Sequence, residues 1–141
     1  MARIKIDLPS NFSFTTNISI SIADINYGNH LSNDKVLAFA HEARLRFFNS
    51  LGCSELDLGD GTSVIMGDAG IEYLSEGFYG DDIQINVGIG DMGSKSFDLV
   101  FLMENLTTGK PLAKVKTGIV CFDYKTRTTA DVPASFRNNF F

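Results

Sequence analysis

Only one segment of this chain has the periodicity of a long helix, and it lies between segments that alternate like strands. The helical segment covers residues 33–51, with Ser32 or Asn33 able to cap its start and Gly52 placed to end it. The apolar stripe comprises Val36, Leu37, Ala40, Ala43, Phe47 and Leu51, and it is broadened by Phe39 and Phe48. Because these residues cover more than half of the helix circumference, a sheet that curls around the helix would bury them best.

Strand patterns account for most of the remaining chain. Residues 17–23 alternate, with Ile18, Ile20 and Ile22 on one face and polar residues on the other. Longer strand-like segments follow the helix, at residues 63–76, 81–93, 95–110 and 111–127. A glycine, Gly67 or Gly70, is expected to bulge or break the first of these segments. The tail at residues 128–141 is expected to be partly an extended segment packed along the domain (a strap) and partly disordered.

This order of elements predicts an α+β fold in a single domain spanning residues 1–141. One long helix would be wrapped by a curled antiparallel sheet of about five strands. A sheet of this kind has exposed edge strands, and pairing one of them across a two-fold axis is a common way to cover it. The sequence therefore predicts a homodimer.

The overall composition excludes several classes of protein. A formal charge of −5 and a pI of about 4.8 argue against a nucleic-acid-binding domain, which is usually basic. No window is apolar enough for a membrane span, and the first residues lack the apolar core of a signal peptide. The two cysteines, Cys53 and Cys121, have no metal-ligand spacing around them. We expect a cytoplasmic protein without a metal or other cofactor.

The connector ADINYGNHLSND, residues 23–34, carries far more hydrogen-bonding side chains than a turn requires. It joins the first strand pattern to the helix and holds His30, one of the two histidines of the chain. Some of these residues have ordinary structural explanations, because Asn and Gly tolerate the positive φ angles of turns. Gly28 and Asn29 fit that role best, while His30 could simply hydrogen-bond to the backbone before the helix.

The order of motifs resembles the hotdog-fold acyl-CoA thioesterases of the 4-hydroxybenzoyl-CoA thioesterase-like superfamily. Many members carry an Asp-x-Asp/Asn segment, then His-Val/Leu-x-Asn, then a helix with Glu-Ala-Arg. The matching residues here are Asp24, Asn26, His30, Leu31, Asn33, Glu42, Ala43 and Arg44. Residues 78–83 and 116–124 also resemble strands of that family. The resemblance covers roughly residues 14–125.

The resemblance implies hydrolysis of a fatty or aromatic acyl-CoA by attack of an activated water on the thioester. Backbone amides at the helix N-terminus would polarise the thioester carbonyl, as the positive end of a helix can. The acyl group would enter an apolar slot between subunits of a homodimer or a dimer of dimers. Tyr27, Gly28 and Asn33 would then contact the substrate.

One departure from the family pattern affects the mechanism. Many members have an aspartate, acting as nucleophile or general base, where this chain has Asn26, and an amide cannot take a proton at neutral pH. Asn26 could orient the water or the thioester while another group acts as base. The candidates are His30, because histidine titrates near pH 6.5 in water, then Asp24 and, more remotely, Glu42.

The same departure leaves other functions open. A protein of this fold could bind acyl-CoA or an acylated carrier without cleaving the thioester. A dehydratase of the same fold would also use a histidine and a carboxylate, although it would place the histidine elsewhere relative to the helix. Glu42 and Arg44 could equally be solvated residues of the helix surface.

Overall fold

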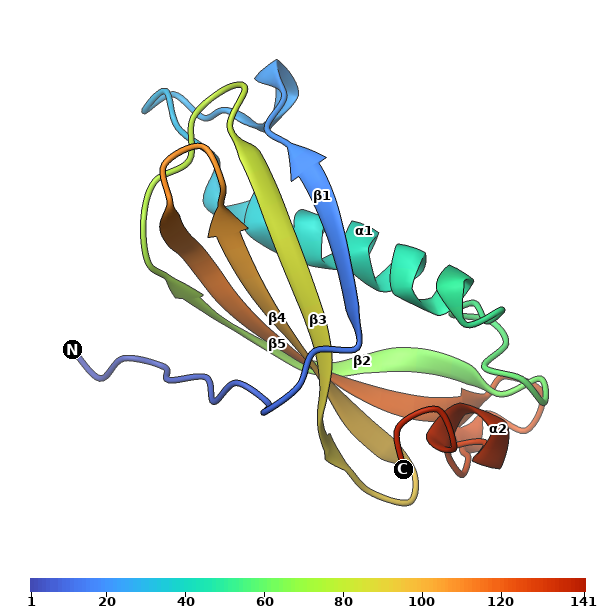
Figure 1. The fold of residues 1–141 in the computed structure, drawn as a ribbon. Coiled ribbons are helices and arrows are strands. Elements are labelled where there is room, and N and C mark those ends of the chain that lie inside the picture. The colour runs from blue at the N-terminus through green and yellow to red at the C-terminus, as the bar shows by residue number, and fades with distance from the viewer.

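A computed structural model describes all residues, 1–141, and shows one long helix held against an antiparallel sheet (Figure 1). The sheet order is β1-β3-β4-β5-β2, with a short β6 paired to β5, so that β1 and β2 are the edge strands of the main path. The elements are β1 (Phe14–Ser19), η1 (Ile22–Asp24), α1 (Asn33–Ser50), β2 (Ser63–Tyr73), β3 (Asp82–Met92), β4 (Ser96–Asn105), β5 (Lys110–Asp123), β6 (Thr128–Thr129) and α2 (Ala134–Arg137). The predicted architecture of one helix and a curled antiparallel sheet is confirmed, with six strands instead of about five.

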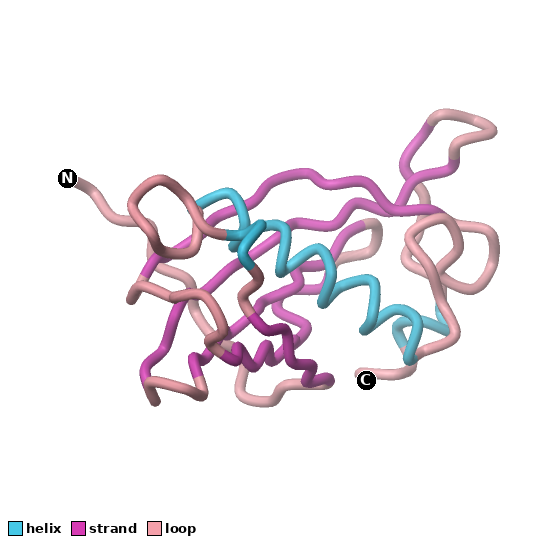
Figure 2. Tube along the Cα trace, turned by 90° about the horizontal axis from the view of Figure 1, so that it is seen from above, coloured by secondary structure: helices cyan, strands magenta, loops and turns pink.

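The helix lies along the concave side of the sheet, and most of the core is between them. Figure 2 shows α1 lying across the strands of the sheet. Alternate residues of β3, β4 and β5 point towards α1, and the core cluster comprises 24 buried residues. The glycine at position 67 produces the expected irregularity of β2, because the register with β5 shifts between Met66 and Asp68.

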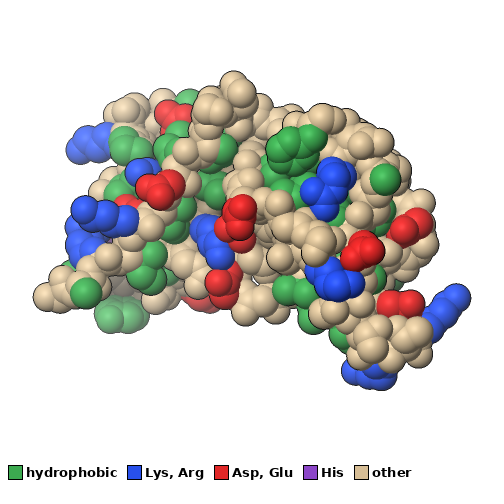
Figure 3. Space-filling model, turned by 90° about the horizontal axis from the view of Figure 1, so that it is seen from below, with side chains coloured by type: hydrophobic (Ala, Val, Ile, Leu, Met, Phe, Trp, Pro, Cys, Tyr) green, Lys and Arg blue, Asp and Glu red, His purple; other side chains and the backbone are tan.

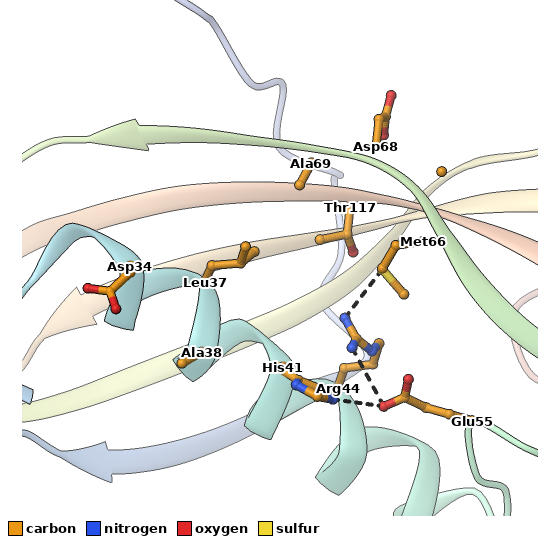
Figure 4. Close-up of a pocket in the computed structure, with 11 residues that line it drawn as sticks. Asp34, Leu37, Ala38, His41, Arg44, Glu55, Met66, Asp68, Ala69 and Thr117 are labelled. Carbon is orange, nitrogen blue, oxygen red and sulfur yellow. Dashed lines mark hydrogen bonds and ion pairs between the residues drawn. The ribbon is translucent and has the colours of Figure 1, made fainter.

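Most of the predicted apolar stripe of α1 is buried, but two residues depart from the prediction. Leu37 is 40% exposed, whereas Arg44, for which a solvated position on the helix surface was left open, is only 5% exposed. The strand segment before the connector also differs from the prediction. The strand ends at Ser19, so that Ile20 is buried while Ile22 lies exposed in η1. One flank of α1 is therefore open along the edge strand β2, which is where Leu37 lies (Figure 4).

The C-terminal tail is ordered, which corrects the expectation of partial disorder. It runs through β6 into the short helix α2, and Phe136 of α2 is fully buried. The Phe136 ring lies 5.0 Å from Phe97 and 5.9 Å from Phe48, centroid to centroid. Phe140 extends this cluster, 5.2 Å from Phe136. Aromatic side chains of the tail therefore complete the core at the C-terminal end of α1.

Three charged residues of the sheet form an ion-paired cluster. Lys116 lies 2.7 Å from Asp68 and 3.3 Å from Asp98. Figure 3 shows acidic and basic side chains intermixed across one face, with no broad region of either charge. No helix is long and apolar enough to cross a membrane.

Candidate functional site

The connector before α1 is folded around the side chain of Asn26. Its Oδ1 accepts hydrogen bonds from the backbone N–H of Gly28 at 2.9 Å and of His30 at 3.4 Å. The backbone N–H of Asn26 in turn donates to the carbonyl of His30, and Asn29 has a positive φ of 68°. An asparagine is well suited to this turn because its amide oxygen can replace a backbone acceptor. Asn26 therefore fixes the position of His30.

His30 is oriented by a hydrogen bond through one ring nitrogen. Its Nδ1 lies 3.1 Å from the carbonyl oxygen of Leu31, and a carbonyl can only accept a proton from it. Neutral His30 therefore carries its proton on Nδ1 and has a free lone pair on Nε2. That nitrogen lies beside Gly28, where a β-carbon would come within 3.2 Å of it. The local geometry leaves His30 Nε2 available to take a proton.

The two carboxylates predicted as candidate bases both form other interactions. The carboxylate of Asp24 accepts from the backbone N–H and the hydroxyl of Ser21, at 2.8 and 2.9 Å. Glu42 pairs with Arg46 one turn later at 3.1 Å, and Arg46 also reaches across to β1. The chain thus does not bring Glu42 together with His30. Tyr27 is fully exposed at the tip of the connector.

The first turn of α1 has an unused backbone hydrogen-bond donor. Ser32 occupies the N-cap position, but its hydroxyl bonds to the carboxylate of Asp34 and not to the helix backbone. The backbone N–H of Asn33 donates to no acceptor in the protein, whereas the backbone N–H of Asp34 is directed at its own carboxylate. The Asn33 N–H, together with the helix dipole, can stabilise a negative oxygen.

A cavity of about 770 Å³ opens beside this turn. Its lining includes most of the substrate-contacting residues predicted from the sequence, among them Tyr27 and Asn33, although Gly28 and Asp24 do not line it. It also brings in Tyr73, Ser75 and Glu76, which come from the end of β2 and the loop that follows. Four of the site residues predicted from the sequence therefore line this cavity: Asn26, Tyr27, His30 and Asn33.

Tyr73 joins the edge strand to the helix. Its hydroxyl donates to the backbone carbonyl of Asn33 at 3.0 Å. Burial, and secondarily the charge of Asp34, raise the pKa of Tyr73 above its ordinary value, so the phenol stays protonated and able to donate. The end of β2 is thereby tied to the first turn of α1.

A second cavity, of about 640 Å³, continues along α1 from Asp34 (Figure 4). It lies between the helix and β2, and Arg44 and Glu55 are at its far end. Arg44 is 3.5 Å from Glu55, whose same oxygen lies 3.0 Å from Nε2 of His41. Burial lowers the pKa of Arg44, and the nearby Glu55 carboxylate partly offsets that effect.

Sequence reasoning missed the residues that the strands bring to these cavities. Tyr73, Glu76 and Thr117 lie far along the chain from the connector, and nothing in their local patterns distinguishes them from ordinary strand residues. Arg44 carried a usable signal, since it interrupts the apolar face of the helix. A cation at such a position needs a partner, which is the loop residue Glu55.

Comparisons with known proteins agree with the architecture. A 1,4-dihydroxy-2-naphthoyl-CoA thioesterase from Synechocystis superposes with a TM-score of 0.80 at 21% identity, over 89% of this chain and 93% of that one. A protein from Staphylococcus aureus solved in complex with CoA gives 0.81 at 19% identity, over 95% and 84%. A DHNA-CoA thioesterase from the same organism gives 0.76 at 17% identity, over 88% and 83%.

Sequence comparison points the same way. No curated protein sequence matches the chain. The family model described as the thioesterase-like superfamily matches residues 20–140, which include the connector, α1 and both cavities. The chain therefore belongs to the thioesterase-like superfamily and has the hotdog fold of its members.

Proposed function

We propose that this protein is an acyl-CoA thioesterase whose reaction centre lies between His30 and the first turn of α1. The observation that carries the proposal is the pairing of two complementary features at one cavity. Neutral His30 has a free lone pair on Nε2, and Asn33, which lines the same cavity, offers a backbone N–H that has no acceptor. A base and an oxyanion-binding group are the two elements that thioester hydrolysis by water requires.

The reaction then proceeds in two steps. His30 Nε2 takes a proton from a water while the water oxygen attacks the thioester carbonyl carbon, and the carbonyl oxygen becomes an oxyanion held by the Asn33 N–H and the positive end of the helix. The carbon–sulfur bond breaks as the oxyanion collapses. His30 returns the proton to the departing sulfur, which leaves as the free thiol of CoA, and the acyl group leaves as a carboxylic acid.

Asn26 supports this chemistry by position and not by proton transfer. Its Oδ1 already accepts two backbone hydrogen bonds that shape the turn around His30. Asp24 is occupied by Ser21, so we assign it to the structure of the connector. Glu76 is the one acidic residue among those that line the same cavity, and it is therefore the alternative source of a carboxylate base.

We further propose that two copies pair through β2. This strand is an edge of the sheet and runs for 11 residues, with small or apolar residues such as Met66, Gly67 and Ala69 exposed near its middle. An uncovered edge of that length presents unpaired backbone N–H and C=O groups that can bond to another strand. Both cavities border β2, so a second copy there would close them from the open side.

Thiol release from a panel of short, long and aromatic acyl-CoAs tests the proposal. His30→Ala should lower kcat by about 10²–10⁴-fold, the usual contribution of a general base. Asn26→Ala should lower it less, through the displaced turn, and Glu76→Gln should leave most of the activity. Asn17→Ala, at an exposed position of β1, is the matched control.

The panel also separates hydrolysis from simple binding. An unchanged rate in His30→Ala together with a large loss in Glu76→Gln would move the base to Glu76. Binding of acyl-CoA without release of thiol from any substrate would instead make the protein an acyl-CoA or acyl-carrier binding protein. The substitution of Asn26 for the usual aspartate is the observation that favours this second function.

A further inference from the structure

The cavity between α1 and β2 has the direction and lining of a slot for an acyl chain. It begins at Asp34, in the first turn of α1, and its far end is at Arg44, ten residues later. At about 1.5 Å per helical residue, the two Cα atoms are separated by roughly 15 Å along the axis. The apolar lining comes from Leu37, Ala38, Met66 and Ala69.

The far end of this slot contains buried polar atoms without partners. Nε of Arg44 and the hydroxyl oxygen of Thr117 make no hydrogen bond in the protein, although the two residues are 5% and 1% exposed. In Figure 4 the Thr117 hydroxyl points from β5 towards the helix side of the cavity, above the Arg44 guanidinium. Buried polar groups are nearly always paired in native proteins, so an unpaired donor and an unpaired hydroxyl lining one cavity indicate a missing ligand atom.

The other donors of Arg44 are already occupied. Nη2 faces Glu55 at 3.5 Å, and Nη1 lies 3.6 Å from the sulfur of Met66. Met66 lies beside the Arg44 guanidinium, and its flexible, unbranched side chain can move aside when a ligand enters. The Arg44 end of the slot is therefore bordered by a movable apolar side chain.

The charges around the slot argue against an anionic ligand group. Glu55 already compensates Arg44, and Asp34 contributes a further negative charge at the entrance. A carboxylate entering here would face three carboxylates, because Asp68 also lines the cavity, with Arg44 as the one permanent cation. A neutral oxygen avoids that repulsion, and it can accept from Arg44 Nε while sharing a hydrogen bond with the Thr117 hydroxyl.

We propose that the slot selects acyl chains of medium length that carry a neutral oxygen, a hydroxyl or keto group, at the end remote from the thioester. This inference rests on the proposed function, because it places the thioester carbonyl at the first turn of α1. Arg44 and Thr117 then determine specificity and take no part in bond breaking.

The test compares three thioesters of equal chain length: dodecanoyl-CoA, ω-hydroxydodecanoyl-CoA and dodecanedioyl-CoA. The wild-type protein should favour the hydroxylated chain over the plain chain by roughly 10-fold or more in kcat/KM, as expected for a hydrogen bond to a charged donor. The dicarboxylic derivative should be the poorest substrate. Thr117→Val, which keeps the shape of the side chain, should reduce the preference about fivefold, and Thr117→Ser should retain it.

Equal kcat/KM values for the plain and hydroxylated chains in the wild type would overturn the proposal. A preference that persists unchanged in Thr117→Val would also overturn it. Calorimetric titration with dodecanoate and ω-hydroxydodecanoate provides a readout independent of hydrolysis. If no thioester is cleaved but the hydroxylated acid still binds about 10-fold more tightly, the slot assignment holds while the hydrolase proposal fails.

Discussion

Replacement of Phe136 by alanine tests whether the C-terminal tail is part of the core. The side chain is 0% exposed, and its ring lies between 5.0 and 5.9 Å from those of Phe48, Phe97 and Phe140. Truncation of a buried phenylalanine usually costs about 3–5 kcal/mol, from lost burial and the cavity that remains. Total stabilities of domains are only about 5–15 kcal/mol, so this one change removes a large share.

The size of the expected change in melting temperature follows from chain length. An unfolding entropy of about 2.1 cal/mol/K per residue gives roughly 0.3 kcal/mol/K for 141 residues. The Phe136→Ala variant should therefore melt about 10–17 °C below the wild type. Calorimetry measures the melting temperature, and urea unfolding monitored by circular dichroism measures the free energy of unfolding independently.

The matched control is Phe141→Ala, which removes the same side chain from an exposed position five residues later. It should change stability by less than about 0.5 kcal/mol. If Phe136→Ala is as stable as this control, then the tail does not belong to the cooperative core, and our description of α2 as its closing element is refuted.

Three further predictions follow from local geometry. Gly28→Ala should lower thioester turnover while leaving the melting temperature nearly unchanged, because its β-carbon would lie 3.2 Å from Nε2 of His30 and displace the ring. Asp57→Asn should destabilise the protein at neutral pH but progressively less in acid. Hydrogen bonds from two glycine N–H groups hold the pKa of Asp57 below its ordinary 3.8, so the stabilising effect of this carboxylate is lost as pH falls through that lowered value. Urea titrations of both proteins at several pH values measure the difference. Cys121 should resist thiol reagents at pH 8 until the protein is unfolded, since burial raises its pKa to about 11, and mass spectrometry of labelled peptides reports this.

Each of these predictions has a clear contrary result. Gly93→Ala places its β-carbon in ordinary contact, 3.7 Å from the nearest atoms, and is the control for Gly28→Ala. Equal turnover in both variants would mean that the position of His30 does not matter for catalysis. A constant stability difference across acid pH would remove Asp57 as a titrating contributor, and rapid labelling of native Cys121 would contradict its burial.

The sequence was most informative where local chemistry and tertiary structure agree. The alternation in β3, β4 and β5, the position of Ser32 before α1 and of Gly52 after it, and the bulge at Gly67 all follow from side-chain periodicity and backbone geometry. The connector was also recognisable, because its crowded polar residues form one continuous local turn.

Predictions failed where burial depends on distant segments. Leu37 is exposed and Arg44 is buried because β2 and the loop carrying Glu55 cover the helix unevenly, and helical periodicity contains no information about that cover. The tail was underestimated for the same reason. A four-residue helix has no periodic signal, and only its contacts with the aromatic core make α2 stable.

The hydrogen bond from Tyr73 to Asn33 links assembly to chemistry. Tyr73 ends the strand that we propose as the dimer edge, while Asn33 begins the helix whose first N–H group we place at the oxyanion. Dissociation of the two copies would free the strand and loosen the same turn that holds the reacting carbonyl. The specific activity should consequently fall on dilution below the dimer dissociation constant. Tyr73→Phe should weaken this dependence of activity on protein concentration. Subunit concentration would then itself control turnover.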